Sequence, residues 1–154
     1  MGNGLSPISD KGRLTIPAEL RGTIEANAAG RTLVLTQHNV SPCLVGFDSE
    51  WATFLNEEIK RDEALERTAG RGFDRPNTYR RAFSNVVRLP FDASGRFIFN
   101  GHLRDEASLT DFAFFNGVGD VFEIWNPQTL LDASDVDDSL KRACAWHLKN
   151  KGAK

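Results

Sequence analysis

Apolar residues along the chain gather in short runs separated by polar turns, a pattern typical of strands. Such runs occupy residues 33–35, 43–47 and 121–125. Two other stretches, one after Asp48 and one after Asp135, have apolar residues at the spacing of a helix. The pattern therefore predicts an α+β fold in which helices join and flank the strands.

One stretch of the chain occurs twice. Residues 9–21 read SDKGRLTIPAELR and residues 92–104 read DASGRFIFNGHLR, so the two align without a gap. Each copy has a glycine where a tight turn with positive φ is favourable, followed by an arginine on a short apolar strand. In the first copy, residues 18–21 open a short helix behind Pro17. The repetition indicates one supersecondary unit that was duplicated and fused, with an arginine at the tip of each strand hairpin.

Helices are predicted between the copies and near the end of the chain. The first begins after Asp48 or Ser49 and ends near the glycine-rich residues 69–72, and the second covers residues 78–85. A short helix starts at Pro127, and a closing amphipathic helix follows it. We expect the apolar side chains of these helices to face the core.

Two segments show no clear periodicity. Residues 1–7 contain Gly, Asn, Ser and Pro and are predicted to form a tail. Residues 22–30 are predicted to be a weakly helical or irregular link to the next strand. We expect neither segment to contribute a strand.

Length and composition bound the domain organisation. The chain has 154 residues and is 40% hydrophobic, which suits one domain with an adequate core. Each hairpin unit alone is too small to bury its apolar face. We therefore expect a single intertwined domain over residues 1–154, with a first repeat at 5–69, a second at 78–131 and a C-terminal helix at 132–154.

Charge is unevenly distributed along the chain. The net charge is only −2, whereas a basic surface is the usual mark of a nucleic-acid-binding protein. Most of the bases lie between residues 60 and 104, and residues 105–138 contain acids and no base. A chain with such segregation can present a cationic face while it is acidic overall.

The residues that often carry chemistry are few and scattered. Cys43 and Cys144 fit neither a disulfide framework nor a metal-ligand spacing, which favours buried thiols in a reducing compartment. His38 near Cys43 is interpreted as a loop histidine beside a core cysteine, because no second ligand pair accompanies them. His102 and His147 lie far from any nucleophile pattern. The sequence therefore predicts no enzyme activity, no cofactor and no metal, and no run is long and apolar enough for a membrane span.

Three motifs in a fixed order resemble one protein family. They are residues 11–21, the second Gly-Arg copy, and the sequence GVGDVFEIW at residues 117–125. Together they resemble the MraZ family, the two-copy members of the SpoVT/AbrB-like group, over residues 5–131. The resemblance implies a duplicated swapped-hairpin β barrel with flanking helices and a ring-shaped homo-oligomer. It also implies a cytoplasmic, nucleoid-associated regulator that binds double-stranded DNA upstream of cell-division and cell-wall genes.

The resemblance gives the two hairpin arginines a role in reading DNA. Arg13 and Arg96 would reach the major groove and pair with guanine, and Asp92 would orient Arg96 through a charge-assisted hydrogen bond. Ser9 stands at the position equivalent to Asp92, and Asn100 stands opposite Pro17. We therefore expect Arg13 to be less constrained than Arg96.

Other basic residues are candidates for phosphate contacts. Lys11, Arg21 and Arg104 would mainly bind phosphate, although Arg21 and Arg104 are equally well interpreted as exposed charges at helix ends. Arg80 and Arg81 are interpreted first as a solvated helix face. Because one chain offers a weak footprint, a ring on DNA would gain affinity from several subunits, which predicts direct repeats in the operator.

One alternative function belongs to a different class. The acidic C-terminal third could neutralise a basic protein partner, as in an antitoxin-like module of the same broad fold. The chain length and the fused duplication count against this alternative.

Overall fold

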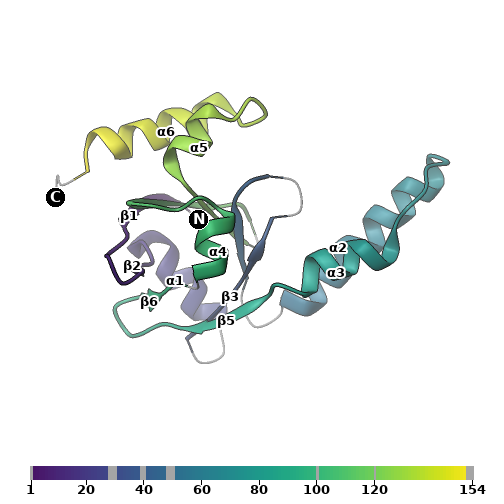
Figure 1. Cartoon of the computed structure of the whole chain (residues 1–154), viewed down its shortest axis with the longest axis horizontal. Coiled ribbons are helices and arrows are strands. Elements are labelled where there is room, and N and C mark those ends of the chain that lie inside the picture. The colour runs from purple at the N-terminus through teal and green to yellow at the C-terminus, as the bar shows by residue number, and fades with distance from the viewer. Residues whose placement is uncertain are drawn as a thin grey trace.

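The structure is a computed structural model of the chain that describes residues 2–27, 31–38, 41–47, 51–99, 101–119 and 121–151. Helices and strands alternate along it (Figure 1). The first half contains β1 (Asn3–Pro7), β2 (Arg13–Thr15), α1 (Ala18–Asn27), β3 (Thr32–Gln37), β4 (Leu44–Phe47) and α2 (Trp51–Thr68). The second half contains α3 (Arg75–Phe83), β5 (Val87–Pro90), β6 (Arg96–Ile98), α4 (Gly101–Glu106), β7 (Phe112–Gly117), β8 (Phe122–Trp125), α5 (Pro127–Asp132) and α6 (Asp138–Lys149).

The strands form two sheets. Six strands pair in the order β1-β7-β8-β4-β3-β5, and β2 pairs with β6 as a separate two-stranded ribbon. Every strand pair is antiparallel. The predicted α+β class is confirmed. A closed barrel is not found in the described residues, because β1 and β5 form the two edges of the six-stranded sheet and do not pair with each other.

The two copies of the repeat exchange strands. β1 of the first copy pairs with β7 of the second, with Leu5 opposite Phe114. β5 of the second copy pairs with β3 of the first, with Leu33 opposite Leu89. The first strand of each copy is therefore hydrogen-bonded to the third strand of the other.

The main hydrophobic core contains side chains from both copies. Equivalent positions of the repeat are buried in it as three pairs: Leu14 and Phe97, Ile16 and Phe99, and Leu20 and Leu103. The first member of each pair comes from the first copy and the second from the second copy. The core therefore repeats the symmetry that the sequence alignment indicates.

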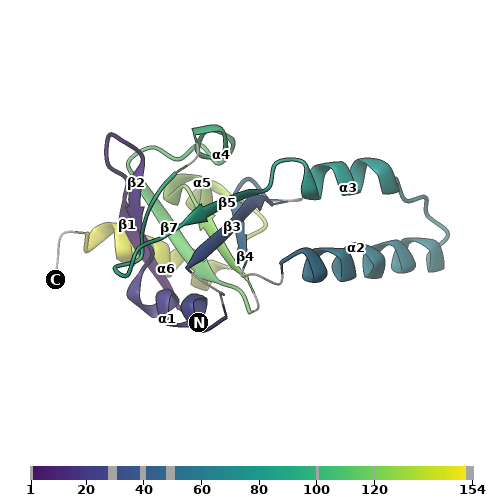
Figure 2. The same cartoon turned by 90° about the horizontal axis from the view of Figure 1, so that it is seen from below.

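Helices α2 and α3 form an antiparallel arm that projects away from the sheets (Figures 1 and 2). Phe54 and Leu55 at the base of the arm pack with Val34 and Val45 of the sheet. Further along, Tyr79 donates from its hydroxyl to Asn56 Oδ1 at 2.7 Å and so ties α3 to α2. The apolar contacts fix the arm at its base, and its far end extends beyond the core.

Helices α5 and α6 cover a second apolar cluster. Phe114, Trp125 and Cys144 are buried there together with Cys43. Burial raises the pKa of the Cys144 thiol to about 11, and burial together with the charge of Glu123 raises that of Cys43 further. Both thiols are therefore core groups with little thiolate character at neutral pH.

The prediction of a tail at residues 1–7 is wrong, because β1 occupies Asn3–Pro7. Ser6 is buried, and β1 forms the edge of the sheet beside β7. Asn, Gly and Ser have low strand propensity, so the segment gives no local signal. Its hydrogen bonds come from a partner more than 100 residues away in sequence.

Helix α3 begins earlier than predicted, at Arg75 instead of residue 78. The Asp74 side chain caps the helix by accepting from the backbone N–H of Asn77 at 3.2 Å. Pro76 lies in the first turn, where its missing N–H costs nothing. The cap and the proline are therefore the signals that place the start of this helix.

Helix α1 is longer than the short helix predicted behind Pro17. It continues through Gly22 to Asn27, in a segment predicted to be weakly helical or irregular. Buried Leu20 and Ile24 anchor it to the core, so packing overrides the weak local propensity. The caps predicted at Asp48 or Ser49 for the next helix lie outside the described residues.

Candidate nucleic-acid interface

The β2–β6 ribbon has one buried and one exposed face. Leu14 and Phe97 lie opposite each other and point into the core. The residues on either side of this pair point outward, as the alternation of a strand requires. Their side chains form the outer face of the ribbon, which carries Arg13, Thr15, Arg96 and Ile98.

The turn of the first copy is closed by Ser9. Its N–H donates to the carbonyl of Arg13 at 2.9 Å, and its own carbonyl accepts from the N–H of Gly12 at 2.9 Å. The Ser9 hydroxyl oxygen accepts from the N–H of Arg13 at 3.0 Å. Gly12 has φ of +76°, which an L-residue adopts only with strain. Within the described part of the chain, the Arg13 guanidinium makes no hydrogen bond, so the turn is fixed while its arginine is not.

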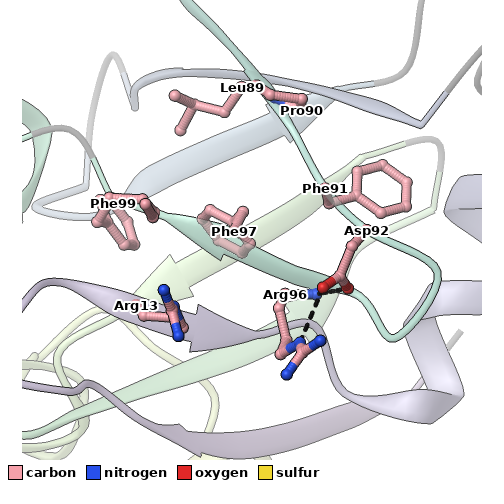
Figure 3. Close-up of a pocket in the computed structure, with 9 residues that line it drawn as sticks. Arg13, Leu89, Pro90, Phe91, Asp92, Arg96, Phe97 and Phe99 are labelled. Carbon is pink, nitrogen blue, oxygen red and sulfur yellow. Dashed lines mark hydrogen bonds and ion pairs between the residues drawn. The ribbon is translucent and has the colours of Figure 1, made fainter.

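The turn of the second copy has the same backbone bonds and two additional restraints, the first of which is a bond from the N–H of Ser94 to Asp92 Oδ1 at 2.9 Å. Asp92 replaces Ser9, and Asp92 Oδ1 accepts from the N–H of Arg96 at 2.9 Å. Asp92 Oδ2 also accepts from Arg96 Nε at 2.8 Å, an ion pair that Figure 3 shows beside Arg13. Hydrogen bonding by the Arg96 backbone N–H and side chain lowers the pKa of the Asp92 carboxyl below its usual range. Asp92 is therefore charged at neutral pH and restrains Arg96.

The two turns are joined to each other and to the sheet. The N–H of Ile16 donates to the carbonyl of Gly95 at 2.8 Å, and the N–H of Phe99 donates to that of Gly12 at 2.7 Å. The Ser6 hydroxyl on β1 accepts from the N–H of Thr15 at 3.1 Å. These bonds make the ribbon a rigid platform that presents both arginines on the same side.

Arg21 and Arg104 lie beside the turn of the opposite copy. A Cβ on Gly95 would lie 2.9 Å from Arg21 Nε, and Arg104 Nη1 is the nearest group to a Cβ on Gly12, at 3.7 Å. Arg104 donates to the carbonyl of Leu109 at 3.2 Å and to that of Thr110 at 3.0 Å. Arg21 Nε is buried and has no hydrogen-bond partner among the described residues. Both side chains therefore pack behind the turns, and this contact was not predicted.

A pocket of about 750 Å³ lies beside the ribbon (Figure 3). Its lining includes the charged residues Arg13, Asp92 and Arg96 and the apolar residues Leu89 and Phe91. The pocket thus joins the charged groups of both turns to an apolar wall from β5 and the residues after it.

The remaining predicted basic residues lie in different places. Lys11 is exposed in the first turn, beside the ribbon. Arg80 and Arg81 are on α3, in the projecting arm and away from β2 (Figure 2). Only Lys11 among these three therefore extends the charged surface formed by Arg13 and Arg96.

Comparison with known proteins identifies the family. No protein-family model matches the chain. The transcriptional regulator MraZ of Rhodospirillum rubrum is 32% identical over 134 residues, which cover 82% of this chain and 78% of that protein. The chain belongs to the MraZ family. Proteins of the same name from a Roseiflexus species and from Gluconobacter oxydans are 33% and 30% identical, with 86% and 88% of this chain and 87% and 80% of theirs covered.

In the ranges that the structure describes, no group of three or more His, Cys, Asp or Glu side chains is placed to hold a metal ion. None of the described helices is both long enough and apolar enough to span a bilayer. His38 follows β3 in a loop, where its Nδ1 accepts from the N–H of Ser41. Its Nε2 lies 3.8 Å from Glu123 Oε2.

Proposed function

We propose that this MraZ-family chain is a transcriptional regulator that reads DNA with the outer face of the β2–β6 ribbon. The observation that carries the proposal is the placement of Arg13 and Arg96 on the same exposed face of a rigid two-stranded ribbon. The major groove of B-DNA is wide enough to admit such a ribbon. The relatives are named as transcriptional regulators, and these names support regulation of transcription by this chain.

Each charged group has a distinct role in this proposal. Arg13 and Arg96 pair with O6 and N7 of guanine, and Asp92 holds Arg96 in the orientation that a bidentate contact needs. Lys11 contacts phosphate and sets the position of the ribbon without reading sequence. Arg21 and Arg104 act mainly by supporting the opposite turns, and the exposed parts of their side chains add to the field that attracts phosphate.

The proposal includes assembly on repeated DNA boxes. One ribbon makes few contacts, so several subunits in a ring would gain affinity through a high effective concentration. Among the described residues, β1 and β5 each have one edge that pairs with no further strand, and these edges together with the segregated charges favour contacts between copies. The proposed boxes are direct repeats upstream of cell-division and cell-wall genes. The protein itself is proposed to be associated with the nucleoid. Exchange of strands between the copies supports the swapped-hairpin arrangement that the family resemblance implies.

The test measures binding to DNA from the promoter region of the protein's own gene, with scrambled DNA as a control. We expect tighter binding to the promoter DNA and a light-scattering mass of several subunits. Lys11→Ala should weaken both DNAs alike and make the slope of log affinity against log salt shallower by roughly 1 for each phosphate that the variant no longer neutralises. Lys60→Ala, which removes an exposed lysine from the arm, is the matched control and should leave the slope unchanged.

Two outcomes would contradict the proposal. Equal affinity for promoter and scrambled DNA would exclude sequence-specific binding by this chain. If Lys11→Ala left the slope unchanged and Arg96→Ala kept full discrimination, the hairpin tips would not be the DNA-binding surface, and Arg80 and Arg81 on the arm would become the candidates.

A further inference from the structure

Ile98 is an apolar residue in the charged outer face of the ribbon. Its side chain is 58% exposed, whereas its neighbours Phe97 and Phe99 are 3% and 6% exposed. It lies directly opposite Arg13 and two residues after Arg96, so it is a neighbour of both arginines on the outer face. It also lines the pocket that contains both of them.

A single exposed isoleucine is ordinary, but this one has a counterpart at the equivalent position of the other copy. Thr15 follows Arg13 as Ile98 follows Arg96, and it lies directly opposite Arg96. Both copies therefore place a side chain with a methyl group two residues after the arginine. Thr15 is half-buried and shorter, so the second copy presents the larger apolar surface.

We propose that Ile98 contacts the C5-methyl group of a thymine in the major groove and so sets part of the sequence specificity. Thymine alone presents a methyl group there, and an apolar side chain is the group that recognises it. The inference rests on the proposed function, because it needs the ribbon in the groove. It adds a base of different chemistry to the guanines that the arginines would read.

The geometry of a strand places that thymine close to the guanines. Residues two apart on one strand are separated by about 6.6 Å. Successive base pairs are separated by about 3.4 Å along the helix axis. The thymine therefore lies one or two base pairs from a guanine read by Arg13 or Arg96.

The test uses a DNA site selected from a random library by the full-length protein. Each thymine in one repeat of that site is replaced in turn by deoxyuridine, which removes the methyl group and keeps the base pair. We expect one replacement to weaken wild-type binding about fourfold, which corresponds to roughly 0.8 kcal/mol for one buried methyl group. The same replacement should leave the affinity of Ile98→Ala unchanged, because that variant has no side chain long enough to reach the methyl group.

Leu65→Ala is the matched control. Leu65 is an exposed aliphatic residue of the arm, at 62%, so its truncation removes a similar side chain away from the ribbon. This variant should show the same fourfold effect of deoxyuridine as the wild type. Thermal unfolding and light scattering of Ile98→Ala should match the wild type, because an exposed side chain adds little to the core.

The outcomes separate the inference from the proposed function. If no sequence is enriched from the library, the proposed function fails. If a site is enriched but deoxyuridine weakens wild type and Ile98→Ala by the same factor at every thymine, only the inference fails. A lower assembly mass of Ile98→Ala with such equal factors would overturn the inference in favour of a contact between copies.

Discussion

The turn before Arg13 and the turn before Arg96 are built on the same backbone hydrogen bonds and differ in the residue that begins each of them. Ser9 and Asp92 each bond to the N–H of the arginine through a side-chain oxygen, at 3.0 and 2.9 Å. Only Asp92 has a second oxygen, and it holds the Arg96 guanidinium. The shape of the turn and the restraint of the arginine are therefore separate properties of the repeat.

A further difference lies behind the turns. Arg21 packs closely against Gly95, whereas the nearest group to a Cβ on Gly12 is 3.7 Å away. Two groups thus restrain the second turn. Asp92 accepts hydrogen bonds from Arg96, and Arg21 packs against Gly95. In the first turn the charges of Asp10 and Lys11 cancel, whereas the second turn has the negative charge of Asp92, so the first turn is less negative and has fewer restraints. The comparison indicates that Arg96 is held in position in the second copy, whereas Arg13 is more adaptable in the first.

The largest expected effect concerns DNA affinity. Arg96→Ala should weaken binding to the preferred DNA by about 2 kcal/mol, the value for one bidentate contact to guanine. Arg13→Ala should cost about 1 kcal/mol less, because a free side chain loses entropy when it binds. Titration of both variants with preferred and scrambled DNA tests this. A larger loss from Arg13→Ala would reverse the roles of the two copies.

The second effect concerns stability. Alanine in place of Gly12 or Gly95 must adopt positive φ, at a cost of about 1 kcal/mol. Gly95→Ala must also displace Arg21, so we expect it to lower the free energy of unfolding by about 2 kcal/mol in total. Urea unfolding of the two variants measures both values. Equal losses would mean that Arg21 moves aside at no cost.

A smaller effect is expected when the first turn is given the residue of the second. Ser9→Asp keeps an acceptor for the N–H of Arg13 and adds an oxygen within reach of its guanidinium. We expect the affinity for the preferred DNA to rise by about 0.5 kcal/mol, because a restrained side chain loses less entropy when it binds. Asp92→Ser is the reciprocal control and should lower affinity while the backbone bonds remain. A loss of affinity in Ser9→Asp would show that positive charge at the first turn matters more than restraint.

The smallest effect is a pH dependence confined to the second copy. The pKa of Asp92 is lower in the folded chain than the value of about 3.9 for an unfolded chain, so its contribution to stability is present above that value. The contribution is lost as the pH falls through the lowered pKa of the folded state. The difference in unfolding free energy between wild type and Asp92→Asn should be constant from pH 7 to 5 and shrink below about pH 4. A difference that does not change with pH would exclude this role of the carboxylate.

The sequence predicted the parts of the site that depend on local spacing. Arg13 and Arg96 follow turn glycines, so the alignment placed both, and the family resemblance added Asp92, four residues before its arginine. The alternation of a strand also puts Ile98 on the same face as Arg96, and it is the signal by which this residue could have been found. The position of Arg21 beside Gly95 could not be predicted, because it depends on the exchange of strands between the copies.

The fold shows the same division. Periodicity predicted helices α2 and α6, and Pro127 predicted the start of α5, whereas β1 and β5 were not predicted as strands. The gapless alignment gives a signal for both if it is extended upstream, since it places Pro7 on Pro90 and Ile8 on Phe91. What the alignment cannot give is the partner of β1, because strand pairing between distant segments leaves no mark in local propensity.

The pairing of β1 with β7 has a consequence for synthesis of the chain. The first strand emerges from the ribosome early, but its partner at Phe112–Gly117 follows more than 100 residues later. At typical rates of synthesis, roughly 5–20 residues per second, β1 has no strand to pair with for several seconds. Contacts between such distant segments also slow folding, because the intervening chain must first be closed into a loop. Most residues of β1 are small or polar, which is why the sequence did not predict this strand. For the same reason the unpaired segment exposes little apolar surface that could aggregate.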